Sequence, residues 1–319
     1  MNKPVEFDLP YPIRPYPKLI INAAITGMVH TRADTPHVPI SVEEIIDDAC
    51  RCQRAGASIL HIHARDKKGL PSADRRIYAE IIEGIRSRCP EVIICVSTSG
   101  RVDGAFEKRV DVLNLEGPLK PDMASLTLGS LNFLKQASVN SPQTIENLAL
   151  KMKENHIVPE LEIFDTGMIN AARMLAGRGV LKGPFYCNLL LGSAYTAQAT
   201  LFDLAYMAGA LPAGFNWAAA GIGKFQLNMN IAAVLMGANV RVGLEDNIFY
   251  DSEKKILATN EMLIERIVRI AREIGREIAT PTEARQMLGL SADSNFSIIS
   301  PARNFPQRQS GQADLSRIF

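Results

Sequence analysis

The chain has 319 residues, 47% of them hydrophobic, and its 35 basic and 34 acidic residues leave a net charge of +1. A chain of this length and apolar content can bury a large core, either as one α/β barrel or as two smaller domains. The balanced charge argues against nucleic acid and charged membrane surfaces as partners, and no apolar run reaches the roughly eighteen residues that span a bilayer.

The five cysteines bear on the redox compartment. They are Cys50, Cys52, Cys89, Cys95 and Cys187, and the N-terminus lacks the apolar segment of a secretory leader. We therefore expect reduced, mostly buried thiols in a cytoplasmic protein. Cys50 and Cys52 are two apart within a helical pattern and point to different faces, so they are not expected to form a ligand pair.

In chain order, residues 1–17 come first and are rich in proline and aromatic residues, which is typical of an extended arm lying on the body or on a neighbouring subunit. The apolar stretch Lys18–Thr26 predicts a buried first strand. Ser41 and Glu44 then form a capping box that opens a helix.

Strand and helix patterns alternate from there to residue 290. Further strands are expected at Ser58–Asp66, from Glu91, at Met123–Gly129 and Ile157–Asp165, from Phe185, from Phe215 and at Asn239–Asp246. The segment Arg109–Gly117 stays open between strand and other structure. Eight apolar strands alternating with helices predict a single (β/α)8 TIM barrel over residues 18–290, followed by a polar C-terminal tail, 291–319.

The strand Ser58–Asp66 carries His61 and His63, which are two apart and therefore project to one side. In the last strand, Glu245 lies on the same face as Arg241. Two histidines and one carboxylate with an open position are a frequent catalytic zinc set. The alternative, from spacing alone, is that the histidines are ordinary buried residues.

Other polar residues also come late in their strands, where a barrel places its chemistry. They are Ser97, Thr98, Ser99, Ser125, Thr127, Glu160, Glu162 and Asp246. Each hydroxyl can alternatively bond loop backbone. Glu160 and Glu162 point inward together and need a cationic or N–H partner, and we expect Glu160 to support a ligating histidine.

The segment Gly221–Gln226 follows the seventh strand and opens a helix, where barrels often bind phosphate. It is not a P-loop, because Ala218 occupies the position of the required first glycine. The alternatives are a phosphate-binding turn and an ordinary tight turn.

Several motifs in order resemble the β-keto acid cleavage enzyme family. They are AAITG from Ala23, HIHARD from His61, STSG from Ser97, LKPDMASLTLGSLNF from Leu119, PELEIFDTGMI from Pro159 and MGANVRVGLEDN from Met236. The resemblance covers about Leu19 to Leu288. It implies a zinc-dependent barrel enzyme that condenses a β-keto acid with acetyl-CoA and cleaves the adduct to acetoacetate and a new CoA thioester.

By position, the resemblance implies zinc ligands at His61, His63 and Glu245. It places the catalytic aspartate at Asp246, with Arg241 and Ser97 in support. The substrate-binding positions that match are Thr98, Gly100 and Ser125, the last replacing a threonine. It also implies a homo-oligomer.

One position departs from the family pattern. Members that act on an amino β-keto acid carry a glutamate where this chain has Val29. An apolar side chain cannot pair with an ammonium group, so we expect an amino keto acid not to be the preferred substrate.

Two alternatives remain at this stage: a metal-dependent hydrolase, and a non-catalytic barrel that binds a ligand. The hydrolase class usually draws further histidines from later strands, whereas only His156 follows His63 here.

Overall fold

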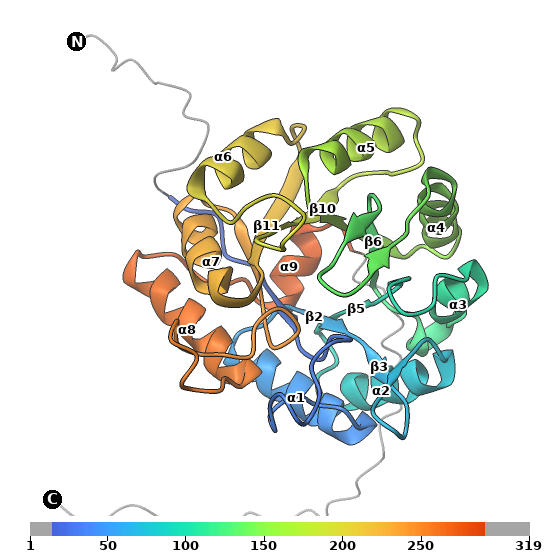
Figure 1. The fold of residues 1–319 in the computed structure, drawn as a ribbon, viewed down its shortest axis with the longest axis horizontal. Helices are drawn as coiled ribbons and strands as arrows, with labels where there is room; N and C mark the ends of the chain where they lie inside the picture. The colour runs from blue at the N-terminus through green and yellow to red at the C-terminus, as the bar shows by residue number, and fades with distance from the viewer. Residues whose placement is uncertain (1–14, 291–319) are drawn as a thin grey trace, which may run out of the picture.

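The computed structural model describes residues 15–290 and shows eight parallel strands closed into a barrel with helices around it (Figure 1). The barrel strands are β1 (Ile21–Ala24), β2 (Ile59–Ile62), β5 (Ile93–Val96), β6 (Met123–Thr127), β9 (Val158–Ile163), β10 (Phe185–Leu191), β11 (Phe215–Gly221) and β12 (Asn239–Val242). They pair in chain order, and β12 closes the ring onto β1. The predicted (β/α)8 TIM barrel is confirmed. Of the predicted arm and tail, residues 1–14 and 291–319 lie outside the described residues.

The helices lie between and after the barrel strands along the chain. They are α1 (Val42–Ala55), α2 (Arg75–Arg88), α3 (Phe106–Val110), α4 (Pro142–Glu154), α5 (Thr166–Gly177), α6 (Leu201–Ala210), α7 (Gln226–Leu235), α8 (Asn260–Glu273) and α9 (Pro281–Met287). Ser41 and Glu44 form the predicted capping box at the start of α1. A serine, threonine or aspartate side chain also caps the start of α2, α4, α5, α6, α8 and α9, whereas α3 and α7 have no side-chain cap.

The segment that the sequence left open is helical. Its residues belong to α3 and to the 3-10 turns η1 (Asp111–Asn114) and η2 (Gly117–Leu119). Arg109, Val112 and Leu113 are buried there at a spacing of three and four residues, which is a helical spacing and not a strand spacing. The 3-10 turn η3 (Gly223–Phe225) precedes α7.

Two short hairpins stand apart from the barrel sheet. β3 (Ala64–Arg65) pairs antiparallel with β4 (Pro71–Ser72), and β7 (Leu131–Asn132) pairs with β8 (Ala137–Ser138). Each belongs to a loop that follows a barrel strand, so they lie at the C-terminal end of the barrel, where loops build sites.

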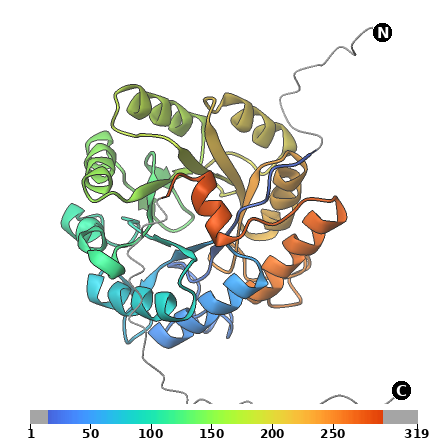
Figure 2. The same ribbon diagram turned by 180° about the vertical axis from the view of Figure 1, so that it is seen from behind.

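The opposite end of the barrel is closed by α9, which Figure 2 shows lying across it. Ala284 and Leu288 pack there in an apolar cluster with Ile59 and Ile93, the first residues of their strands. Arg285 is buried and donates to Asp122 over 2.9 Å. This end is therefore sealed, and the opposite end remains for ligands.

The cysteines correct one expectation. Cys50 of α1 and Cys89 at the end of α2 form a disulfide, whereas Cys52, Cys95 and Cys187 are free and buried. The expectation of reduced thiols was therefore wrong for Cys50 and Cys89. The packing of α1 against α2 brings their Cα atoms to 6.1 Å, within reach of a disulfide, and the spacing of the two residues along the chain does not show this.

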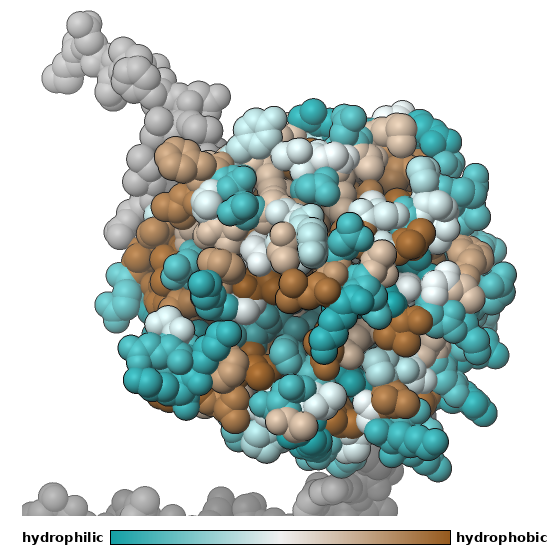
Figure 3. Space-filling model, in the orientation of Figure 1, coloured by the Kyte–Doolittle hydropathy of each residue, from teal (hydrophilic) through white to brown (hydrophobic). Residues whose placement is uncertain are grey.

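The surface at the C-terminal end mixes polar and apolar residues (Figure 3). Hydrophobic residues reach the surface near the centre of this view and along its left edge, beside α6 and α7. Leu201 and Phe202 of α6 are among the exposed large apolar residues. Within residues 15–290, no helix is long and apolar enough to cross a membrane.

Candidate active site

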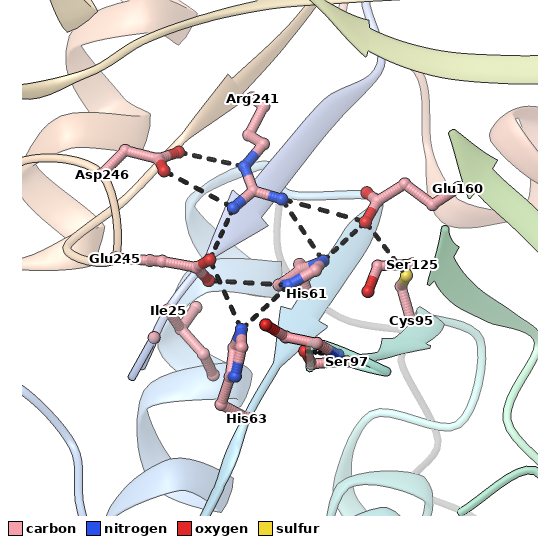
Figure 4. Close-up of polar contacts among 12 residues, drawn as sticks. Ile25, His61, His63, Cys95, Ser97, Ser125, Glu160, Arg241, Glu245 and Asp246 are labelled. Carbon is pink, nitrogen blue, oxygen red and sulfur yellow. Dashed lines mark hydrogen bonds and ion pairs between the residues drawn. The ribbon is translucent and has the colours of Figure 1, made fainter. Parts of the chain in front are cut away.

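The polar side chains singled out in the sequence meet inside the C-terminal half of the barrel (Figure 4). His61 comes from β2, Glu160 from β9 and Arg241 from β12. All three are at most 1% exposed. Parallel strands with alternating side chains bring residues that are distant in sequence to the same layer of the barrel interior. The structure thus brings together residues that the sequence places in separate strands.

The three candidate metal ligands lie in mutual contact. Nε2 of His61 and Nε2 of His63 are 3.2 Å apart. The Glu245 carboxylate faces both rings, with Oε2 at 3.6 Å from His61 Nε2 and Oε1 at 3.4 Å from His63 Nε2. One ligand atom from each of the three residues lies within 4.8 Å of the others. This spacing suits a single ion between them.

The orientation of His61 is set by Glu160, whose Oε2 lies 2.6 Å from Nδ1 of the ring. Burial works to raise the pKa of Glu160, but His61 and Arg241 hold it at about 2. An ionised carboxylate only accepts, so Nδ1–H of His61 donates to it. The ring is thereby turned so that Nε2 faces His63 and Glu245.

Electrostatics also favour a cation at this point. Burial alone would lower the pKa of His61, yet Glu160 and Glu245 raise it to about 9. The pKa of His63 is lowered by burial, so this ring is neutral. The space between the rings and Glu245 therefore attracts positive charge. Without a metal, this charge is a proton on His61, and a divalent ion can take the place of that proton.

The donor set fits zinc. Oε2 of Glu245 is buried and has no hydrogen-bond partner among residues 15–290, which is costly for a carboxylate oxygen unless a ligand satisfies it. Two imidazole nitrogens and one carboxylate oxygen are donors that zinc accepts, with room for a substrate oxygen. His61, His63 and Glu245 would hold the ion.

Arg241 is the centre of the charged cluster and is 1% exposed. It donates from Nη2 to Glu245 over 2.7 Å and from Nε to Asp246 over 3.0 Å. Its Nη1 lies 3.4 Å from Oε1 of Glu162. Its Nη1 also lies 3.8 Å from Oε2 of Glu160, so that one guanidinium supplies the counter-charge to four buried carboxylates.

The two neighbouring carboxylates Glu245 and Asp246 differ in proton affinity. Burial works to raise both pKa values, but Arg241 and His63 bring that of Glu245 well below its ordinary value. For Asp246 burial prevails over Arg241, and its pKa is raised. Glu245 is therefore suited to remain charged, whereas Asp246 is suited to take up and release a proton.

Gly243 makes the placement of Glu245 possible. Its φ is +154°, and a Cβ there would lie 2.1 Å from the backbone oxygen of Ala24 on β1. With no side chain in the way, the chain turns over the end of β1, and the Glu245 amide donates to Ala24 O over 3.1 Å. The backbone of β1 thus fixes where the ligand loop begins.

Several site residues were not singled out as functional from the sequence. Asn22 donates to Glu160 Oε1 over 2.5 Å, Cys95 donates to Glu160 Oε2 over 3.3 Å, and Asn22 Nδ2 lies 3.4 Å from the Tyr186 hydroxyl. Asn22 interrupts the apolar first strand, and this polar interruption was a usable signal. Cys95 and Tyr186 resemble ordinary core residues in sequence.

Ser97 and Thr98 follow β5 and line a solvent-open hollow of about 480 Å³ that His63 also borders. Thr98 is fully engaged with β6, donating from its amide to Ser125 Oγ over 3.1 Å and from Oγ1 to Ser125 O over 2.6 Å. Ser97 Oγ accepts from the Ser99 amide over 3.1 Å, which leaves its O–H available to donate. The hollow beside the candidate metal ligands is therefore lined with hydroxyl groups.

Two other predicted positions lie in segments that follow barrel strands. Val29 follows β1 and is 48% exposed. In the Gly221–Gln226 segment, the Gly223 amide donates to the Asp246 backbone oxygen over 2.7 Å. This amide supports the loop of Asp246 and is not free for an anion, and the phosphate-binding hypothesis stays a prediction.

Fold and site together define a (β/α)8 barrel with a buried cluster of two histidines, four carboxylates and an arginine at the C-terminal ends of its strands. The chain belongs to the β-keto acid cleavage enzyme family, whose sequence model matches residues 18–290.

Characterised relatives match across the barrel. The chain is 43% identical over 275 residues to a 3-keto-5-aminohexanoate cleavage enzyme of Fusobacterium nucleatum, covering 86% of this chain and 98% of the relative. It is 35% identical over 274 residues to a 3-oxoadipate:acetyl-CoA acetyltransferase of Cupriavidus necator, covering 85% and 94%. Among solved structures, the apo form of ObcA matches with a TM-score of 0.73 at 20% identity, over 81% of this chain and 66% of that chain. This last likeness concerns the fold.

Proposed function

We propose that the protein is a zinc-dependent β-keto acid cleavage enzyme that uses acetyl-CoA as cosubstrate. Family membership and the names of the relatives, which include an acetyl-CoA acetyltransferase, support the reaction class. The observation that carries the proposal is the convergence of His61, His63 and Glu245, whose Oε2 has no hydrogen-bond partner among the described residues, next to the Arg241–Asp246 pair.

The reaction exchanges acyl groups between two substrates. A β-keto acid and acetyl-CoA give acetoacetate and the CoA thioester of the remaining acyl group. A new bond joins the carbon that bears the carboxylate group to the acetyl carbon, and the bond from the acetyl carbon to the CoA sulfur breaks. The CoA thiolate then bonds to the keto carbon, and the old bond from the keto carbon to the carboxylate-bearing carbon breaks. Bound zinc would supply a Lewis acid that polarises the keto oxygen, an effect worth several kcal/mol.

Residues of the chain would carry out proton transfer, orient the base and bind the substrate. Asp246, with its raised pKa, would remove a proton from the carbon between the keto group and the carboxylate, and would return it to that carbon when acetoacetate is released. Arg241 would hold the Asp246 carboxylate in place through its Nε. The free hydroxyl hydrogen of Ser97 would donate to an oxygen that gains charge, and Gly100 and Ser125 would bind the substrate carboxylate.

The substrate tail is proposed to be neutral or aliphatic. Val29 stands at the rim where a glutamate would be needed to pair with an ammonium group. We further propose a cytoplasmic homo-oligomer. Of the alternatives, the hydrolase gains no support, because His156 is exposed ahead of β9 and outside the site.

One experiment tests reaction and site together. Zinc content and acetoacetate release from acetyl-CoA would be measured for the wild type and Glu245→Gln with a panel of β-keto acids. We expect about one zinc per chain and product from the wild type alone. Zinc without product for any keto acid would contradict the reaction, and a metal-free, active wild type would contradict the zinc site.

A further inference from the structure

Arg109 is a buried arginine outside the cluster around Arg241. It is the buried residue of the short helix α3 and is 3% exposed. Its Nε donates to the Thr98 backbone oxygen over 2.7 Å, whereas its Nη1 has no hydrogen-bond partner in the part of the chain that the structure describes. A buried guanidinium without a carboxylate in contact carries charge that a nearby anion would stabilise.

The guanidinium lies directly against Gly100. A Cβ at Gly100 would be 3.0 Å from Nη1 and 3.1 Å from Cζ of Arg109. The absence of a side chain at this position is therefore what lets the positive charge approach the backbone of the loop Ser97–Gly100. The close contact with Arg109 therefore explains why position 100 is a glycine.

The contact continues from Arg109 through Thr98 to Ser125. Thr98 accepts from Arg109 with its backbone oxygen and donates twice to Ser125, once from its amide and once from its hydroxyl. Because Ser125 Oγ accepts from the Thr98 amide, its own hydrogen points elsewhere. Arg109 and Thr98 both line the hollow beside His63.

We propose that Arg109 is a positioning residue for the β-keto acid. It holds the loop Ser97–Gly100 against Ser125 and places its positive charge beneath that loop, so that the loop binds the substrate carboxylate. This inference rests on the proposed function. Acetyl-CoA carries no carboxylate, so its binding does not depend on Arg109.

The first test uses Arg109→Met and Arg109→Lys in the zinc-loaded enzyme. Loss of a charged hydrogen-bonding group predicts that Arg109→Met raises KM for the keto acid about 10- to 100-fold, with KM for acetyl-CoA and zinc content unchanged. Lysine retains the charge without the planar fork, so Arg109→Lys should recover part of the loss. An equal rise in both KM values would overturn the inference.

A second pair of variants probes the same contact from the loop. Gly100→Ala places a methyl group against Arg109 and should raise KM for the keto acid in the same way. In the Gly104→Ala control, the new Cβ meets only Gly100 O at 3.7 Å, an ordinary contact, and wild-type values are expected. When Gly100→Ala is combined with Arg109→Met, it should raise KM for the keto acid little beyond the value of the single variant Arg109→Met. Additive effects would contradict the link between the two residues.

The Arg276→Lys variant is a control that distinguishes a purely structural role of Arg109 from a role in substrate binding. Arg276 is also buried and donates to backbone oxygens, including those of Val234 and Ala238, but it lies away from the site. This control should lower the melting temperature without changing either KM. If Arg109→Met behaves like Arg276→Lys, the inference fails.

Binding without turnover separates this inference from the proposed reaction. Calorimetric binding of acetoacetate to the wild type and Arg109→Met should show at least about tenfold weaker binding in the variant. Arg109-dependent binding without any turnover would contradict the reaction and retain the inference. Normal turnover with equal acetoacetate binding to both proteins would retain the proposed reaction and contradict the inference.

Discussion

Nη2 of Arg241 donates to Oε1 of Glu245 over 2.7 Å, and Oε2 of the same carboxylate has no hydrogen-bond partner within the described residues. One oxygen is therefore held by the protein while the other faces His61. The arginine thus orients the carboxylate and keeps it ionised, which are the two properties a metal ligand needs.

Glu245→Gln should reduce zinc affinity by more than about 100-fold, because a neutral amide replaces an anionic ligand. Metal analysis after dialysis against a chelator would measure the loss. Glu146→Gln is the control, because Glu146 pairs with Arg178 on the outside of α4. Full zinc occupancy in Glu245→Gln would contradict the assigned ligand set.

Glu160→Gln should weaken zinc binding about 10- to 100-fold, because an amide can no longer hold Nδ1–H of His61 as a carboxylate does. Competition with a fluorescent chelator gives the affinity. Glu162→Gln is the matched control on the same strand, since Glu162 bonds to Thr127 and Arg241 and to neither histidine. Equal affinities in the two variants would show that the His61 contact is not what matters.

Arg241→Met should destabilise the metal-free protein by about 3–5 kcal/mol, because it leaves buried carboxylates without their counter-charge. Urea unfolding measures the free energy. Adding Glu162→Gln removes one of these carboxylates and should recover part of the loss. A variant as stable as the wild type would mean that the carboxylates are protonated in the folded state.

Val29→Glu should shift preference toward an amino β-keto acid. Val29 is 48% exposed, so the change is tolerated by the fold, and a carboxylate at the rim can pair with an ammonium group. We expect the ratio of kcat/KM for the amino substrate over a neutral one to rise about 10-fold. Val29→Gln, which adds similar bulk without charge, should leave the ratio near that of the wild type. If the wild type already prefers the amino substrate, the role given to Val29 is wrong.

Much of the fold is predictable because its signals are local. Ser41 and Glu44 lie three residues apart, and the helix start they predict is confirmed. The alternation in Ser58–Asp66 places His61 and His63 on one side of a strand whatever the rest of the chain does. The secondary structure of Arg109–Gly117 could not be predicted, because the spacing of its apolar residues fits both a strand and a helix.

The partners of these residues are not local. Which carboxylate meets which cation depends on the register of strands around the closed barrel: Glu160 reaches both His61 and Arg241, whereas Glu162, two residues on, hydrogen-bonds to Arg241 and to neither histidine. The same holds for the disulfide between Cys50 and Cys89. No spacing along the chain encodes these distances.

The sequence by itself therefore determined the eight-strand barrel, the pair of histidines on one face and the set of polar residues at the strand ends, since hydrophobic period and capping act over a few residues. Only the tertiary structure decided that Arg241 pairs with four carboxylates, that Oε2 of Glu245 faces His61, and that Arg109 lies against Gly100. Barrel closure brings these groups together, and the energies of buried charges depend on distances that only closure sets.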